Sequence, residues 1–181
     1  EVIDPLGNKT TTKYDAIGQI TSVIDPNNNE TKYTYDRLDR RIKITDALSQ
    51  NTNFTYDAEG NLLSLTDPNN NKTSYTYDRL NRMVTDTNQL GKIRSYTYDA
   101  VGNQTQIKDR NDRIRKFNYD KLDRNTSETW IDGNNNSVRA IDYQYDAVGQ
   151  LSSVLDPNSK YTYTYDAAGR NTSVDNLGTL G

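Results

Sequence analysis

The chain has 181 residues, a formal net charge of −3 and a mean hydropathy of −1.00. Its 22 basic and 25 acidic residues are interspersed, which leaves no basic stripe for nucleic acid and no polybasic patch for membranes. No run of apolar residues exceeds two, so we expect no transmembrane helix, and the first residues show no signal-peptide pattern. The absence of Cys and His excludes thiolate chemistry, disulfides and the usual general base.

The dipeptide Tyr-Asp recurs eight times, and this repetition decides the predicted fold. The first six copies are 21 residues apart, and the last two steps are 26 and 20 residues. A fixed period of this length is typical of an array in which each repeat stacks on its neighbours. The 14 regularly placed tyrosines favour order despite the low hydropathy. The pairs are Tyr14-Asp15, Tyr35-Asp36, Tyr56-Asp57, Tyr77-Asp78, Tyr98-Asp99, Tyr119-Asp120, Tyr145-Asp146 and Tyr165-Asp166.

The third period, taken in chain order, predicts two strands and two turns. Residues 54–56 alternate aromatic and polar side chains, as in a half-buried strand, and residues 57–60 have the composition of a tight turn. Residues 62–66 predict a second strand, residues 67–71 a second turn, and residues 72–77 the next strand. This leaves no room for a helix of ordinary length. We therefore predict an all-β fold, a repeat array of about 21-residue two-stranded units that forms a twisted, spiralling antiparallel β-sheet strip.

The turn after Tyr-Asp alternates between two classes, which makes a super-period of 42 residues. The fourth turn position is Gly in one class and Asp or Asn in the other, and all three residues enter positive φ at low cost. One backbone turn therefore serves both classes. The second class also carries basic residues, which we interpret as an ion-pair rim rather than a binding site. The first class has Gly18, Gly60, Gly102 and Gly149; the second has Asp39, Asn81 and Asp123, with the basic residues Arg37, Arg40, Arg79, Arg82, Lys121 and Arg124.

The array is irregular near its C-terminal end. The run Asp132-Gly133-Asn134-Asn135-Asn136 stands where other repeats have a shorter turn, so we expect an enlarged loop near residues 130–139. Trp130, the only tryptophan, is expected to pack against this irregular repeat, and Gly169 breaks the alternation of turn classes. We assign residues 1–181 to a single array of about eight units and expect it to be part of a longer chain.

An aromatic residue stands two positions before most of the repeated tyrosines. Residues i and i+2 of a strand lie on one face, so each strand offers two rings to one side and a polar residue, usually Thr, to the other. Stacked repeats would align these rings into ladders, at about 0.2–1 kcal/mol per pair. A platform for sugars or nucleobases is the alternative interpretation. The preceding aromatics are Tyr33, Phe54, Tyr75, Tyr96, Phe117, Tyr143 and Tyr163.

The many carboxylates do not indicate catalysis, because a catalytic pair is a singular feature and these acids recur in every repeat. The acidic turns at Asp25, Asp67 and Asp156 lack the dense spacing of an EF-hand loop. We predict no enzyme, no catalytic residue, no cofactor and no metal site. The residues singled out are the structural ones: the eight Tyr-Asp pairs together with Gly18, Gly60, Gly102, Gly149 and Gly169.

Segments 56–62 (Tyr-Asp-Ala-Glu-Gly-Asn-Leu) and 145–151 (Tyr-Asp-Ala-Val-Gly-Gln-Leu), with the Asp-Pro-Asn turns that follow, resemble the YD-repeat or RHS-repeat family. This family includes bacterial Rhs toxins, insecticidal toxin-complex subunits, wall-associated proteins and teneurins. The resemblance implies a strip that spirals into a hollow shell, which in bacterial members encloses a toxic domain released after autoproteolysis. The sequence has too few repeats to close a large shell and no recognisable toxic or autoproteolytic segment, so no catalytic residue is carried over.

Three functions follow from this pattern. The first is a structural segment of a secreted or cell-surface shell, bacterial by its resemblance, that encapsulates or presents a toxin or effector. The second is an extracellular adhesion module for a glycan or protein, and the third is a filament that assembles through open sheet edges. The expected partners are further repeats of the same chain or other copies, an encapsulated toxin domain, or glycans. Nucleic acid and membrane insertion are not expected.

Overall fold

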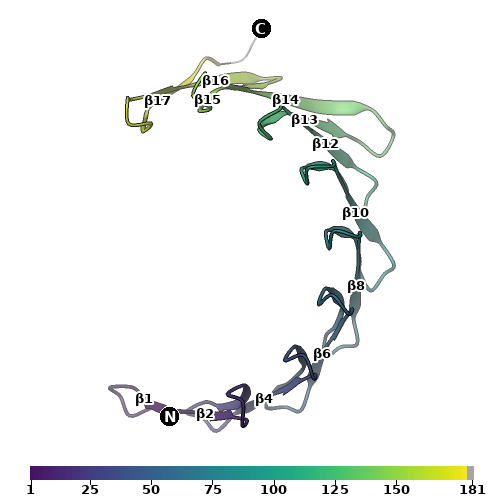
Figure 1. The fold of residues 1–181 in the computed structure, drawn as a ribbon, viewed down its shortest axis with the longest axis vertical. Coiled ribbons are helices and arrows are strands. Elements are labelled where there is room, and N and C mark those ends of the chain that lie inside the picture. The colour runs from purple at the N-terminus through teal and green to yellow at the C-terminus, as the bar shows by residue number, and fades with distance from the viewer. Residues whose placement is uncertain (179–181) are drawn as a thin grey trace. The chain divides into compact units, whose positions relative to one another are not determined.

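A computed structural model describes residues 1–178, in which all seventeen elements are β-strands (Figure 1). The chain divides into two compact units, Glu1–Lys92 and Ile93–Gly181. Within each unit every strand pairs antiparallel with the next one in the sequence, for example β6 with β7 and β7 with β8. The predicted all-β antiparallel fold with two strands per repeat is confirmed. No element formed by residues 1–178 is an apolar helix of membrane-spanning length.

The strand boundaries follow the predicted period closely. In the third repeat β6 ends at Tyr56, and β7 and β8 have the predicted limits. The first compact unit holds β1 (Val2–Ile3), β2 (Lys9–Tyr14), β3 (Ile20–Ile24), β4 (Glu30–Tyr35), β5 (Arg41–Thr45), β6 (Asn51–Tyr56), β7 (Leu62–Thr66), β8 (Lys72–Tyr77) and β9 (Met83–Thr87). The second holds β10 (Ile93–Tyr98), β11 (Gln104–Lys108), β12 (Ile114–Tyr119), β13 (Asn125–Ile131), β14 (Ser137–Tyr145), β15 (Leu151–Asp156), β16 (Ser159–Tyr165) and β17 (Asn171–Asn176).

Antiparallel order places successive turns alternately at two edges of the strip. We call the edge with the turns that begin at the repeated Asp the Tyr-Asp rim, and the other edge the opposite rim. Both rims use the same backbone turn. At Asp57 the N–H donates to the Asn61 carbonyl at 3.0 Å, and at Asp67 the N–H donates to the Asn71 carbonyl at 3.0 Å. The turns predicted at residues 57–60 and 67–71 therefore share one hydrogen-bond pattern.

The fourth residue has positive φ in both turn classes of the Tyr-Asp rim, as predicted, and in the opposite-rim turns other than the shorter one at Asp156. Gly60 has φ 95° and Asn81 has φ 59° on the Tyr-Asp rim, and Asn70 has φ 62° on the opposite rim. The N–H of this fourth residue donates to the carbonyl of the first, which closes the turn. Because only residues tolerant of left-handed backbone fit here, the position recurs as Gly, Asn or Asp, with Ser49 as a further variant.

The strip has no buried apolar core. No apolar side chain of residues 1–178 is buried, and the buried side chains are polar, such as Ser22 and Ser64. The face away from the aromatic side chains is joined by polar pairs across strands, including Thr55 Oγ1 with Ser64 Oγ at 2.7 Å. Cohesion therefore depends on hydrogen bonds repeated along the strip more than on burial of apolar surface.

The prediction of an enlarged loop near residues 130–139 is wrong. Asp132 opens an ordinary turn, in which its N–H donates to the Asn136 carbonyl at 2.9 Å. The extra residues instead lengthen β13 to 7 and β14 to 9 residues, and Trp130 lies opposite Arg139 in their ladder. Residues added to paired strands keep their backbone groups hydrogen-bonded, whereas residues added to a loop would leave several without partners.

Replacing Gly60 by Ala is expected to destabilise the strip by about 1 kcal/mol, because an L-residue is strained at this φ. A Cβ at Gly60 would have no neighbour within 4 Å, so backbone strain alone is measured. Urea unfolding followed by circular dichroism gives the difference. The matched control Asp39→Gly relieves the same strain at φ 62° and should leave stability equal or higher. Equal unfolding midpoints for Gly60→Ala and the parent chain would contradict the prediction.

Candidate functional site: the Tyr-Asp turn and its neighbours

The hydroxyl of the repeated tyrosine bonds to the preceding repeat. Tyr77 Oη donates to the Leu62 carbonyl at 3.0 Å. The β7–β8 ladder begins only at Ser64, so Leu62 lies beyond its end and the hydroxyl supplies the partner that the ladder does not. The same bond, at 2.8–3.0 Å, joins Tyr35 to Ile20, Tyr56 to Arg41, Tyr119 to Gln104, Tyr145 to Asn125, and Tyr165 to Leu151.

A β-bulge lies opposite this tyrosine, on the strand that follows it. The strand register shifts between Thr55 and Tyr56, and a shift stands directly before the repeated tyrosine in β2, β4, β8, β10, β12, β14 and β16 as well. The extra residue lies on the facing strand, because Thr55 pairs with Ser64 and Tyr56 with Leu62. This leaves Leu63 of β7 without a partner in this ladder and bends β7 beside Leu62. The sequence pattern predicted ring ladders for the tyrosines and did not predict the hydroxyl bond. A signal was present, since Phe replaces Tyr at the earlier aromatic position but never at the repeated one.

The aspartate of each pair organises its own turn. Asp36 Oδ1 accepts the N–H groups of Leu38 at 2.9 Å and Arg40 at 3.1 Å, and Oδ2 accepts Arg40 Nε at 2.8 Å. In the other turn class Asp57 Oδ1 accepts the Asn61 N–H at 2.7 Å and Oδ2 accepts Asn61 Nδ2 at 2.9 Å. These hydrogen bonds from Arg40 and Asn61 lower the pKa of Asp36 and Asp57, respectively.

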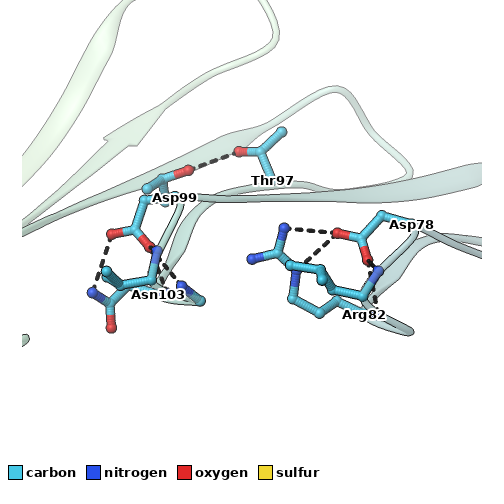
Figure 2. A network of polar contacts seen from close by, with 9 residues as sticks. Asp78, Arg82, Thr97, Asp99 and Asn103 are labelled. Atoms are coloured by element: carbon cyan, nitrogen blue, oxygen red, sulfur yellow. Dashed lines mark hydrogen bonds and ion pairs between the residues drawn. The ribbon is translucent and has the colours of Figure 1, made fainter.

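The same arrangement recurs in other turns. Figure 2 shows the Arg82 side chain on the Asp78 carboxylate and the Asn103 side chain on the Asp99 carboxylate. The residue four positions after Asp thus has the same role whether it is Arg, as at Arg82, or Asn, as at Asn103. In two turns of the glycine class it is Gln19 or Gln150, whose backbone N–H donates to the aspartate. The interpretation of the basic residues as an ion-pair rim holds for Arg40, Arg82 and Arg124, which pair with their own turn aspartates at 2.6–2.7 Å. Arg37, Arg79 and Lys121 are exposed and form no ion pair within residues 1–178.

The residue four positions after the turn aspartate also contacts the next turn of the same rim. Arg40 Nη1 donates to the Asp57 carbonyl at 2.6 Å, and its guanidinium stacks 4.9 Å from the Tyr56 ring centroid. In the other class Asn61 Nδ2 donates to Asn81 Oδ1 at 2.9 Å. Asn103 makes the same bond to Asp123 Oδ1 at 2.9 Å. Arg40, Asn61 and Asn103 thus link consecutive repeats along the rim.

The lengthened hairpin β13–β14 carries a separate polar cluster. Buried Glu128 accepts hydrogen bonds from Arg115 Nε at 2.7 Å and from Trp130 Nε1. The guanidinium groups of Arg115 and Arg139 lie 5.1 and 5.4 Å from the Trp130 ring, and Arg139 pairs with buried Asp156. A cavity of about 200 Å³ adjoins Trp130. It is smaller than ordinary ligand pockets of about 300–1,000 Å³. Three of its charged lining residues, Asp109, Arg113 and Arg115, are engaged in ion pairs.

The described residues contain no group of three or more acidic side chains placed to hold a metal ion. The structure therefore places the predicted repeat residues in a periodic series of turns and inter-repeat bonds. The aspartate of each pair lies in its own turn, and tyrosines such as Tyr35, Tyr77 and Tyr145 bond to the adjacent repeat. Gly18, Gly60, Gly102, Gly149 and Gly169 all occupy the positive-φ position of their turns.

Comparison with known proteins defines the class. The sequence model described as RHS Repeat matches residues 14–50, 56–92 and 145–179, which is more than half of the chain. The chain belongs to the RHS repeat family. A comparison with curated protein sequences found no match.

Solved structures share the fold. The Tc holotoxin pore of Photorhabdus luminescens aligns with a TM-score of 0.73 and 19% identity, over 90% of this chain and 10% of that chain. The TcdB2-TccC3 crystal structure aligns with a TM-score of 0.64 and 20% identity, over 91% of this chain and 9% of that chain. This chain thus spans about a tenth of the length of those proteins.

Replacing Tyr77 by Phe is expected to cost about 1 kcal/mol, because the Leu62 carbonyl loses its partner while the ring remains. Urea unfolding compared with the parent chain measures this change. Tyr14→Phe is the matched control, since the Tyr14 hydroxyl has no hydrogen-bond partner among residues 1–178 and its side chain is exposed. Equal losses for both variants would show that the hydroxyl bond does not stabilise the strip.

Acid is expected to destabilise the strip. The pKa values of Asp36, Asp57 and Asp120 are lowered by hydrogen bonds from the side chains four residues later. Stability from these groups is complete above the unfolded pKa of about 3.9, and it is lost as the pH falls through the lower folded values. Urea midpoints at pH 7, 4 and 3 should therefore decrease in that order. Asp57→Asn, which reproduces the Asn88 turn, should weaken this pH dependence. A midpoint independent of pH would contradict the prediction.

Proposed function

We propose that the chain is a structural wall segment of an RHS-type shell, in a secreted or cell-surface bacterial protein that encloses or presents an effector domain. The observation that carries this proposal is the bonding between repeats. The Tyr77 hydroxyl and the Asn61 side chain both reach an adjacent repeat. Interactions repeated between neighbours produce a continuous sheet and do not concentrate chemistry at one place.

The carboxylates support a structural role over an enzymatic one. Asp57 is a charged acceptor for its own turn, and its lowered pKa is the opposite of what a general acid near neutral pH requires. The buried Glu128 is occupied by Arg115 and Trp130. We therefore infer no enzymatic activity for this segment and assign the Tyr-Asp pairs and turn glycines to wall construction.

Family membership and the shared fold of the Tc toxin structures support the same role. Since the chain corresponds to about a tenth of those proteins, further repeats of the same protein would complete the wall. The expected partners are these repeats and an enclosed effector domain. The same proposal includes presentation of this effector domain outside the producing cell.

Expression of the gene at its full natural length tests this function. Electron microscopy should show hollow particles, and limited proteolysis followed by mass spectrometry should find an internal segment protected until the particle is denatured. Open strips in which every linker is cleaved at the same rate would contradict enclosure.

A double variant tests whether the bonds between repeats maintain this protection. Tyr77→Ala with Tyr119→Ala removes two inter-repeat hydroxyl bonds and their rings. The protected segment should then be cleaved at least several-fold faster. Tyr14→Ala, which removes a tyrosine without such a bond among residues 1–178, should leave protection close to that of the parent.

A further inference from the structure

The opposite rim of the first compact unit carries exposed leucines at the tips of alternate turns. Leu6, Leu48 and Leu90 each stand two residues after the first residue of a turn, and their exposures are 87, 78 and 75%. The turn uses only the backbone of this position. The Leu48 N–H donates to Asp46 Oδ1 at 2.9 Å, and Asn27 makes the same bond to Asp25 at 2.8 Å. The turn itself therefore does not require leucine.

These leucines are spaced regularly. They are 42 residues apart, which corresponds to four strands or about 19 Å along the strip. The turns between them have Asn27 and Asn69 at the same position, so the tips read Leu, Asn, Leu, Asn, Leu. The following residues of these five turns, Gly7, Asn28, Ser49, Asn70 and Gly91, read the same in both directions as well.

A row that reads the same in both directions is self-complementary about a two-fold axis. With the axis at Leu48, Leu48 meets its counterpart in a second copy, while Leu6 meets Leu90 and Asn27 meets Asn69. All five tips are then matched, Leu with Leu and Asn with Asn. A partner without this repeat would match the row at single positions only.

The absence of charged side chains at these turn tips also favours the opposite rim as the surface that contacts a second copy. The turn residues that precede its tips are Pro5, Pro26, Ala47, Pro68 and Gln89, so the tips carry no charge. On the Tyr-Asp rim the corresponding turns contain Arg37, Asp39, Glu59 and Arg79, whose side chains would have to lose water in a close contact. The opposite rim of the second compact unit has Asn111 and Asn134 at its tips, between Arg110 and Asp112 in one case. The apolar row belongs to residues 1–92.

We propose that the first compact unit forms a two-fold symmetric contact with a second copy of this chain through the leucine tips of its opposite rim. The contact uses turn tips, so it differs from the pairing of open strand edges. It goes beyond the wall function and does not depend on whether the wall encloses an effector. Three leucine pairs form a small interface, and the dimer is expected to be weak and dependent on concentration.

Cysteine cross-linking tests the symmetry, because the chain has no native cysteine. Under mild oxidation Leu48→Cys should form a disulfide-linked dimer by itself. Leu6→Cys and Leu90→Cys should each remain mostly monomeric alone and cross-link when the two variants are mixed. Leu38→Cys is the control, since it has the same turn position and 65% exposure on the Tyr-Asp rim. Equal cross-linking of Leu38→Cys and Leu48→Cys, or self-linking of Leu6→Cys equal to the mixture, would overturn the proposal.

Sedimentation velocity of the unmodified chain gives an independent measurement. The parent chain should show a dimer that increases with concentration, and Leu48→Asn should raise the dimer Kd by about tenfold or more. Asn occurs naturally at this position in two turns of the same rim, so the variant is expected to keep its fold, which circular dichroism verifies. Leu38→Asn should leave dimerisation unchanged. A parent chain that stays monomeric, or equal effects of both variants, would overturn the proposal.

Discussion

The side-chain hydrogen bonds of the turn aspartate are the interaction on which the strip depends. One carboxylate closes the backbone turn through Oδ1 and holds the side chain four residues later through Oδ2, as Asp57 holds Asn61. That second side chain then reaches the next turn, where Asn61 meets Asn81. A local turn and a link between repeats are thus made by the same pair of residues. Because the motif needs no apolar burial, a chain of very low mean hydropathy can still build an ordered sheet.

The tyrosine hydroxyl complements this interaction on the strand side of the turn. The bulge opposite Tyr56 has Leu63 of β7 as its extra residue, and the β7–β8 ladder begins only at Ser64. The Tyr77 hydroxyl bonds to the Leu62 carbonyl, which this ladder does not reach. The Tyr77 hydroxyl therefore bonds to the strand that follows the preceding turn, and the adjacent Asp78 organises the next turn.

The irregular repeat shows how much variation this scheme allows. The longer step between Tyr119 and Tyr145 is absorbed by β13 and β14, whose additional residues stay paired. Trp130 then lies between Arg115 and Arg139 over buried Glu128, on the part of the sheet that the regular repeats lack. The shorter last step is absorbed by a tighter turn, in which Asp156 pairs directly with Ser159. In both cases the strands stay paired, and only the number of residues between successive repeated tyrosines changes.

The sequence by itself determined the all-β class, the two strands per repeat and the positive-φ positions, because these follow from local rules of alternation, turn composition and glycine-like backbone. Only the tertiary structure decided what the repeated side chains bind. The partner of Tyr77 is 15 residues away, and Asn61 meets a residue 20 positions later. The enlarged loop was predicted wrongly for the same reason, since backbone pairing between two strands decides where an insertion is placed. Local pattern specifies the repeat, and contacts across strands specify how repeats are joined.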